Sequence, residues 1–160
     1  MKENYAKLTQ FGQELLTKKS LVEGLPFISK YAKDVIGAER CSIFVYDVDD
    51  NTLWTTLADG IDKIVIPAEK GIVGHTFISG KPTIVFDTSL DPLFNSDIDE
   101  KSGYITKNLI TAPIFNSEHK TIGVLQLLNK EAGFDEKDVK FMTFFAHYVS
   151  GFIELTTLYK

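Results

Sequence analysis

The chain contains no recognisable motif for nucleophilic catalysis or for metal binding. Its three histidines, His75, His119 and His147, are far apart in the sequence and form no HExxH motif. Cys41 is the only cysteine, which excludes an internal disulfide and a cysteine-based zinc site. The sequence has no GxSxG motif, no P-loop and no paired-glycine dinucleotide fingerprint. These observations predict a protein without enzymatic activity.

A glycine pair marks the most informative segment. Gly71 and Gly74 stand at the start of a short helix expected over residues 72–79. The amides of this helix N-terminus could accept an anion, such as the phosphate of a cyclic nucleotide. Alternatively, the glycines permit a tight turn and close packing, which is their commoner use. The pattern alone leaves both interpretations open.

An acidic connection follows this helix. Residues 87–103 contain five carboxylates together with Pro92 and Gly103. A connection this long in a compact domain is usually functional. Its carboxylates do not follow the spacing of an EF-hand loop. We therefore expect a solvated acidic lid over a pocket, with a helical turn near residues 98–102, rather than a cation site.

Apolar periodicity predicts the elements that position this segment. We expect one helix over residues 3–17. A second helix should begin at the N-cap Ser20 and end at Gly37. The Glu23 side chain is expected to bond back to the Ser20 amide, which would complete a capping box. The sequence favours strands over residues 40–47, 52–57, 64–66, 83–86, 108–115 and 121–129.

The last helix is expected to begin at Asp135, a good N-cap, and to run toward Tyr159. Its widest apolar stripe is predicted to cover the sheet and consists of Phe141, Phe144, Phe145, Tyr148, Val149, Phe152 and Leu155. A second interpretation makes the distal turns, together with the N-terminal helix, a dimer seam.

Length and net charge limit the number of domains and the kinds of partner that the chain could have. A chain of 160 residues is most simply one domain. The net charge of −5 argues against nonspecific binding to nucleic acid or to an anionic membrane surface. No signal peptide or transmembrane segment is recognisable. We therefore expect a cytoplasmic location.

The ordered motifs resemble those of GAF domains, especially the type found beside cyclic-nucleotide phosphodiesterases and adenylyl cyclases. The segments that carry the resemblance are Ile66–Pro67, Gly71–His75, Asp91–Phe94, Gly103–Asn108, Ala112–Pro113 and Gly123–Lys130. The resemblance implies an α+β, PAS-like fold with a central six-stranded antiparallel sheet. Helices from both termini would pack on one face and a lidded ligand pocket would lie on the other. Residues 20–160 would form the GAF domain, and residues 1–19 a helical linker or dimerisation segment.

The resemblance also implies which residues bind a ligand. The corresponding positions are Ser42, Asp59, Ile72, Val73, Asn95, Asp99, Ser102, Thr106 and Gln126. The family's NKFDE signature is partly kept, and Lys130 and Asp138 are expected to form a structural bridge. Ala58 stands where nucleotide-binding members place a stacking aromatic, so the resemblance does not specify the ligand. The sulfoxide-reductase branch needs several cysteines, and this chain has one.

Together these observations predict a non-catalytic sensing module of a signal-transduction protein. It would require no cofactor and would bind a small ligand, such as a cyclic nucleotide. It would act as a homodimer through its terminal helices, on an attached or partner effector domain. The alternative is a ligand-free dimerisation module with a vestigial pocket.

Overall fold

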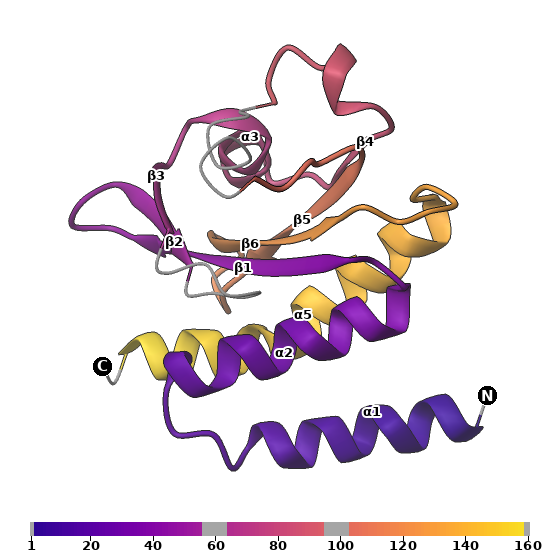
Figure 1. The fold of residues 1–160 in the computed structure, drawn as a ribbon. Coiled ribbons are helices and arrows are strands. Elements are labelled where there is room, and N and C mark those ends of the chain that lie inside the picture. The colour runs from indigo at the N-terminus through magenta and orange to yellow at the C-terminus, as the bar shows by residue number, and fades with distance from the viewer. Residues whose placement is uncertain (1, 56–63, 95–102, 159–160) are drawn as a thin grey trace.

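The computed structural model describes residues 2–55, 64–94 and 103–158, which form an α+β fold around one sheet (Figure 1). Six antiparallel strands are ordered β3-β2-β1-β6-β5-β4, which confirms the predicted sheet. The elements are α1 (Lys2–Leu15), α2 (Leu21–Ile36), β1 (Arg40–Asp47), β2 (Thr52–Thr55), β3 (Ile64–Pro67), α3 (Gly71–Ser79), β4 (Thr83–Val85), the 3-10 helix η1 (Thr88–Leu90), β5 (Leu109–Phe115), β6 (Thr121–Leu128) and α5 (Glu136–Leu158).

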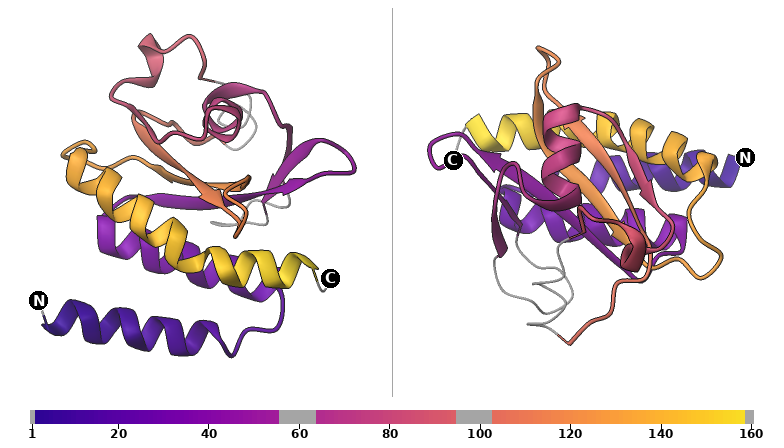
Figure 2. Two further views of the ribbon diagram at one scale, coloured as in Figure 1. Left: turned by 180° about the vertical axis from the view of Figure 1, so that it is seen from behind. Right: turned by 90° about the horizontal axis from the view of Figure 1, so that it is seen from above.

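The helices form layers on the two faces of the sheet. Helices α2 and α5 lie side by side under one face, and α1 lies outside them (Figures 1 and 2). Helix α3 covers the opposite face. The predicted packing of terminal helices on one face is therefore confirmed. None of the helices in the described ranges has the length and apolarity needed to cross a bilayer.

Helix α2 begins and ends at the residues that the sequence indicated. The Ser20 hydroxyl accepts from the Glu23 amide at 3.4 Å, and the helix ends at Gly37. The Glu23 carboxylate accepts from the Lys19 amide at 3.0 Å and not, as predicted, from the Ser20 amide. The Glu23 carboxylate therefore bonds back to the amide one residue before the N-cap Ser20.

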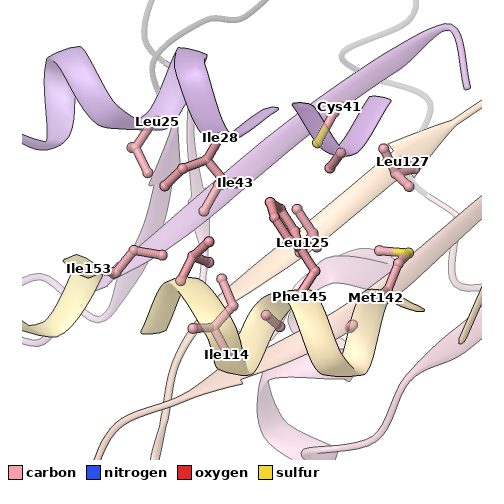
Figure 3. Packing of buried hydrophobic residues seen from close by; sticks show 14 of the residues in the cluster. Leu25, Ile28, Cys41, Ile43, Ile114, Leu125, Leu127, Met142, Phe145 and Ile153 are labelled. Carbon is pink, nitrogen blue, oxygen red and sulfur yellow. The ribbon is translucent and has the colours of Figure 1, made fainter. Parts of the chain in front are cut away.

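The buried side of α5 differs from the predicted stripe. The main core lies between this helix, α2 and the sheet (Figure 3). Its α5 residues are Met142, Phe145, Ala146, Val149 and Ile153. Phe144, Tyr148 and Leu155, which the sequence placed on the covered stripe, are exposed. The apolar residues of α5 span more of the helix than one sheet face can cover, so docking decides which of them are buried.

The two glycines of α3 have structural uses. Gly71 has a φ of 71°, which side chains with a Cβ rarely adopt. A Cβ on Gly74 would lie 2.4 Å from the Glu69 carbonyl carbon, so this helix packs directly on the preceding turn. The packing interpretation of this glycine pair therefore accounts for both positions.

We predict that Gly74→Ala destabilises the protein by about 1–3 kcal/mol, because the added methyl meets backbone that cannot rotate away. Chemical denaturation measures the change. Gly151→Ala is the matched control, since this helical glycine has open space around its Cβ position. That variant should gain about 0.5–1 kcal/mol from helix propensity. Equal effects of the two substitutions would contradict the close packing of α3.

Candidate ligand-binding site

A row of uncharged polar side chains crosses the sheet on the face that α3 covers. Ser42 of β1 pairs with Gln126 of β6, Gln126 pairs with Thr111 of β5, and Thr111 pairs with Thr83 of β4. Directly paired residues of an antiparallel sheet point to the same face and approach closely. We call these four residues the polar row.

The sheet positions this row by alternation. The neighbours of Ser42, Cys41 and Ile43, point into the core formed with α2 and α5. Phe44, two residues after Ser42, packs instead with Val73 of α3. Since side chains alternate between the two faces of a strand, Ser42 shares the α3 face.

Helix α3 adds a fifth polar side chain. The Thr76 and Thr111 hydroxyl oxygens lie 2.6 Å apart, and both residues are fully buried. A buried hydroxyl must be hydrogen-bonded to avoid a desolvation cost, and here one hydroxyl donates to the oxygen of the other. Ser42, Gln126 and Thr83 are only partly buried. The sequence analysis missed this pair, although Thr111 was visible as a polar interruption in an apolar strand.

The beginning of α3 lies on the same face. No side chain caps its first turn at Lys70. The Ile72 and Val73 side chains are buried in two apolar clusters, so these residues could serve a ligand only through their backbone amides. Such amides carry the positive end of the helix dipole and suit an anion.

The structure brings part of the predicted ligand set together. Ser42 and Gln126 lie in direct register, and Ile72 and Val73 belong to the helix above the same face. Thr106 is buried before the start of β5, where its carbonyl accepts from the Thr88 hydroxyl at 2.6 Å. The remaining predicted positions, and Ala58, lie outside the described residues: Asp59, Asn95, Asp99 and Ser102.

A second polar cluster, which the sequence analysis missed, surrounds Tyr104. Its hydroxyl donates to the Glu39 carboxylate at 2.7 Å and accepts from the Asn129 amide at 2.8 Å. The Arg40 guanidinium lies 3.8 Å from the centre of the Tyr104 ring, a cation–π distance. Tyr104 lies 65 positions after Glu39 in the sequence, so no local pattern could reveal the contact.

Asn129 completes this cluster from the end of β6. Its side-chain oxygen accepts from the Lys107 and Asn108 amides at 2.6 and 3.2 Å. Its φ of 58° is left-handed, which asparagine tolerates better than most residues. Asn129 thus holds the segment that leads into β5.

The pKa values of Glu39 and Tyr104 are shifted in opposite directions. The hydrogen bond from Tyr104 is the main cause that lowers the pKa of the Glu39 carboxyl, followed by the bond from Asn129. Burial raises the pKa of the Tyr104 phenol, and the hydrogen bond to Glu39 raises it further. Both shifts favour a neutral phenol that donates to an ionised carboxylate.

Lys130 and Asp138 form the bridge that the resemblance implied. The ammonium nitrogen lies 3.0 and 2.9 Å from the two carboxylate oxygens. The Asp138 carboxylate also accepts from the Asp135 amide at 3.0 Å, while Asp135 accepts from the Asp138 amide at 3.1 Å. The reciprocal cap closes the start of α5, and the Lys130–Asp138 ion pair ties that start to the end of β6. The charges of Lys130 and Asp138 thus pair with each other within the structure.

The histidines and the cysteine lie on different parts of the described structure. All three histidines are exposed, and His119 stacks on Phe115 at 4.4 Å. Cys41 is buried on the face of the sheet that α2 and α5 cover, opposite the polar row. Within the described residues, no three side chains of the histidine, cysteine or carboxylate type gather as metal ligands.

Comparison with known families accounts for this arrangement. A family model of the GAF domain matches residues 23–153. The chain belongs to the GAF family. Helix α1 precedes the matched region, and the polar row and the Lys130–Asp138 bridge lie inside it.

Two solved structures from signalling and transport proteins share the fold. The GAF domain of a phosphoenolpyruvate-protein phosphotransferase from Coxiella burnetii superposes with a TM-score of 0.82 at 19% identity, over 94% of this chain and 92% of that chain. A segment of a methyl-accepting chemotaxis protein gives 0.77 at 22% identity, over 94% and 98%.

The same fold also occurs in an enzyme. Free methionine-R-sulfoxide reductase from Neisseria meningitidis, solved with its substrate, superposes with a TM-score of 0.78 at 20% identity, over 96% of this chain and 89% of that chain. At such identities the similarity establishes the fold and does not transfer the reaction.

The Thr76–Thr111 pair can be tested with a double-mutant cycle. Each single change to valine strands one buried hydroxyl and should cost about 1–3 kcal/mol. The double variant removes both hydroxyls, so its cost should fall clearly below the sum. Chemical denaturation of the four proteins measures the coupling. Additive costs would show that the two hydroxyls do not depend on each other.

We predict that Tyr104→Phe raises the pKa of Glu39 toward its ordinary value, because it removes the strongest hydrogen bond to the carboxylate. NMR titration of the Glu39 carboxyl measures the change. Asp87 is the internal control, because its pKa is lowered by Ser89 instead and should not move. Because the pKa of Glu39 is lower in the folded state, its ionised carboxylate stabilises the folded protein. This contribution is fully present above the unfolded-state pKa and is lost as the pH falls through the folded-state pKa. An unchanged Glu39 titration would disprove the assignment.

Proposed function

We propose that this GAF domain is a non-catalytic regulatory module that binds a small polar molecule between the sheet and α3. The polar row is the observation that carries the proposal. Four hydrogen-bonding side chains lie in register on one face, and Ser42, Gln126 and Thr83 are only partly buried. Ligand sites typically combine an apolar lining with a few such converging polar groups.

The chemistry of the row favours a ligand with both donors and acceptors on one edge. The Gln126 carboxamide and the Ser42 hydroxyl each offer both kinds of group. The same face carries apolar side chains in Phe44, Leu53 and Val124. No member of the row is charged, so hydrogen bonds and apolar contact would provide recognition there. A heteroaromatic ring edge fits this description.

An anionic group of the same ligand could bind the first-turn amides of α3. Cyclic purine nucleotides combine such a group with a heteroaromatic edge, so cAMP and cGMP are suitable probes. The proposal does not restrict the ligand to these two.

The site has a direct connection to the helical layer. Strand β6 carries Gln126 and continues into Asn129 and Lys130. Lys130 binds Asp138 in the first turn of α5, as described above. A ligand that shifts β6 would therefore move the start of α5. We propose this route as the regulatory output of the domain.

Native mass spectrometry tests the proposal directly. The protein is incubated with cAMP, with cGMP and with a small-molecule extract of cells. We expect a bound small molecule and a raised melting temperature, since ligand at 100 times its Kd stabilises by about 2.7 kcal/mol. Gln126→Leu should weaken binding about tenfold or more, as expected for a lost hydrogen-bonding partner.

Gln13→Leu is the matched control, because Gln13 is exposed on α1 and distant from the polar row. This variant should bind as the wild type does. Absence of any bound molecule in all three incubations would refute ligand sensing and favour the ligand-free interaction module. Binding that Gln126→Leu leaves unchanged would refute the location of the site.

A further inference from the structure

The segment between the acidic connection and β5 is held largely by side chains. Residues 104–108 form neither helix nor strand. The Asn129 side chain binds three backbone groups of this segment, including the Ile105 carbonyl at 2.8 Å. Tyr104 stands at the start of the segment and makes its contacts outside it. We call residues 104–108 the entry segment of β5.

Tyr104 reaches the junction between α2 and β1. Its hydroxyl donates to the Glu39 carboxylate, and the Arg40 guanidinium packs on its ring, as described above. Glu39 and Arg40 are consecutive residues, and α2 ends shortly before them at Gly37. One tyrosine side chain thus contacts two neighbouring residues at the point where the chain passes from α2 into the sheet.

The backbone of Glu39 is itself fixed by hydrogen bonds. The Glu39 amide donates to two carbonyls at the end of β6, at 3.1 and 2.9 Å. On the helix side, the Gly37 and Ala38 amides both donate to the Lys33 carbonyl, at 2.9 and 3.2 Å, and close the last turn of α2. Since Ala38 and Glu39 are directly bonded, a displacement of Glu39 strains the hydrogen bonds of this turn.

The contact between Tyr104 and Glu39 lies at the surface. Glu39 is exposed, and Tyr104 is only partly buried. Water can replace either partner of such a hydrogen bond, so the net contribution of the bond to stability is modest. Contacts of this kind open at a free energy far below that of global unfolding. The contact can therefore open and close while the core stays folded.

We infer that Tyr104 is a latch between the entry segment of β5 and the end of α2. In the closed state, the entry segment and the last turn of α2 stabilise each other. When the hydrogen bond opens, the amides of both parts become less protected from solvent.

The use of this latch as a signal rests on the proposed ligand site, because the proposed ligand position Thr106 lies in the same entry segment. A ligand that holds Thr106 in place keeps the latch closed and stabilises the end of α2. This route is separate from the Lys130–Asp138 ion pair, which leads to α5.

Hydrogen exchange of individual amides, followed by NMR on the ligand-free protein, tests the latch. Tyr104→Phe removes the hydroxyl and keeps the ring. We expect the Gly37 and Ala38 amides to exchange about threefold faster or more, because a local stabilising contact is lost. Tyr46→Phe is the matched control, because it removes another phenol hydrogen bond, which Tyr46 donates to the Asn51 side chain at 2.8 Å. This variant should leave exchange at Gly37 and Ala38 unchanged.

A double-mutant cycle tests whether the two sides are coupled. Glu39→Ala removes the other partner and should speed exchange of the Lys107 amide in the entry segment. The double variant Tyr104→Phe/Glu39→Ala should exchange no faster than the faster single variant, because both changes break the same contact. Additive effects, or wild-type exchange at Gly37 in Tyr104→Phe, would overturn the latch.

Addition of cAMP or cGMP separates the latch from the ligand site. A bound nucleotide should slow exchange at Gly37 in the wild type and not in Tyr104→Phe, and equal slowing in both would overturn the latch as a signalling route. Nucleotide binding without faster exchange in ligand-free Tyr104→Phe would refute the latch and retain the ligand site. Faster exchange in a protein that binds no small molecule by native mass spectrometry would retain the latch and refute the ligand site.

Discussion

The pairing of β6 between β1 and β5 is the constraint on which the rest of the structure depends. Side chains of β6 alternate between the two faces of the sheet. Leu125 and Leu127 enter the main core, while Val124 and Gln126 face α3. A shift of one residue in register would exchange these two sets. It would place the Gln126 carboxamide in the apolar core, where no partner would satisfy it.

The two faces of the sheet consequently have different physical properties. The face under α2 and α5 is closed by aliphatic and aromatic packing, and this burial provides most of the folding free energy. The face under α3 carries polar side chains, so it buries less apolar surface. The Thr76–Thr111 hydrogen bond reduces this cost for the two hydroxyls that water cannot reach. The other members of the polar row, Ser42, Gln126 and Thr83, are only partly buried.

The end of β6 connects the segment before β5 with the start of α5. Asn129 holds the segment before β5, and Lys130 holds the start of α5 through Asp138. Strand β6 therefore carries the polar row on one face and packs against the helical layer through the other. In the proposed sensing role, this strand would provide a short path from the ligand to the helices.

The sequence by itself determined the local features and, through ordered motifs, the fold. Ser20 and Gly37 limit α2, and alternating β-branched residues give the strands, because these signals act within a few residues. The paired placement of Ser42 and Gln126 was implied only by family resemblance. Tertiary structure alone decided which side of α5 is buried, since Phe144 and Phe145 are equally apolar and only docking separates them. It also created the Tyr104–Glu39 and Thr76–Thr111 contacts, because each joins residues that are adjacent only after the sheet has formed.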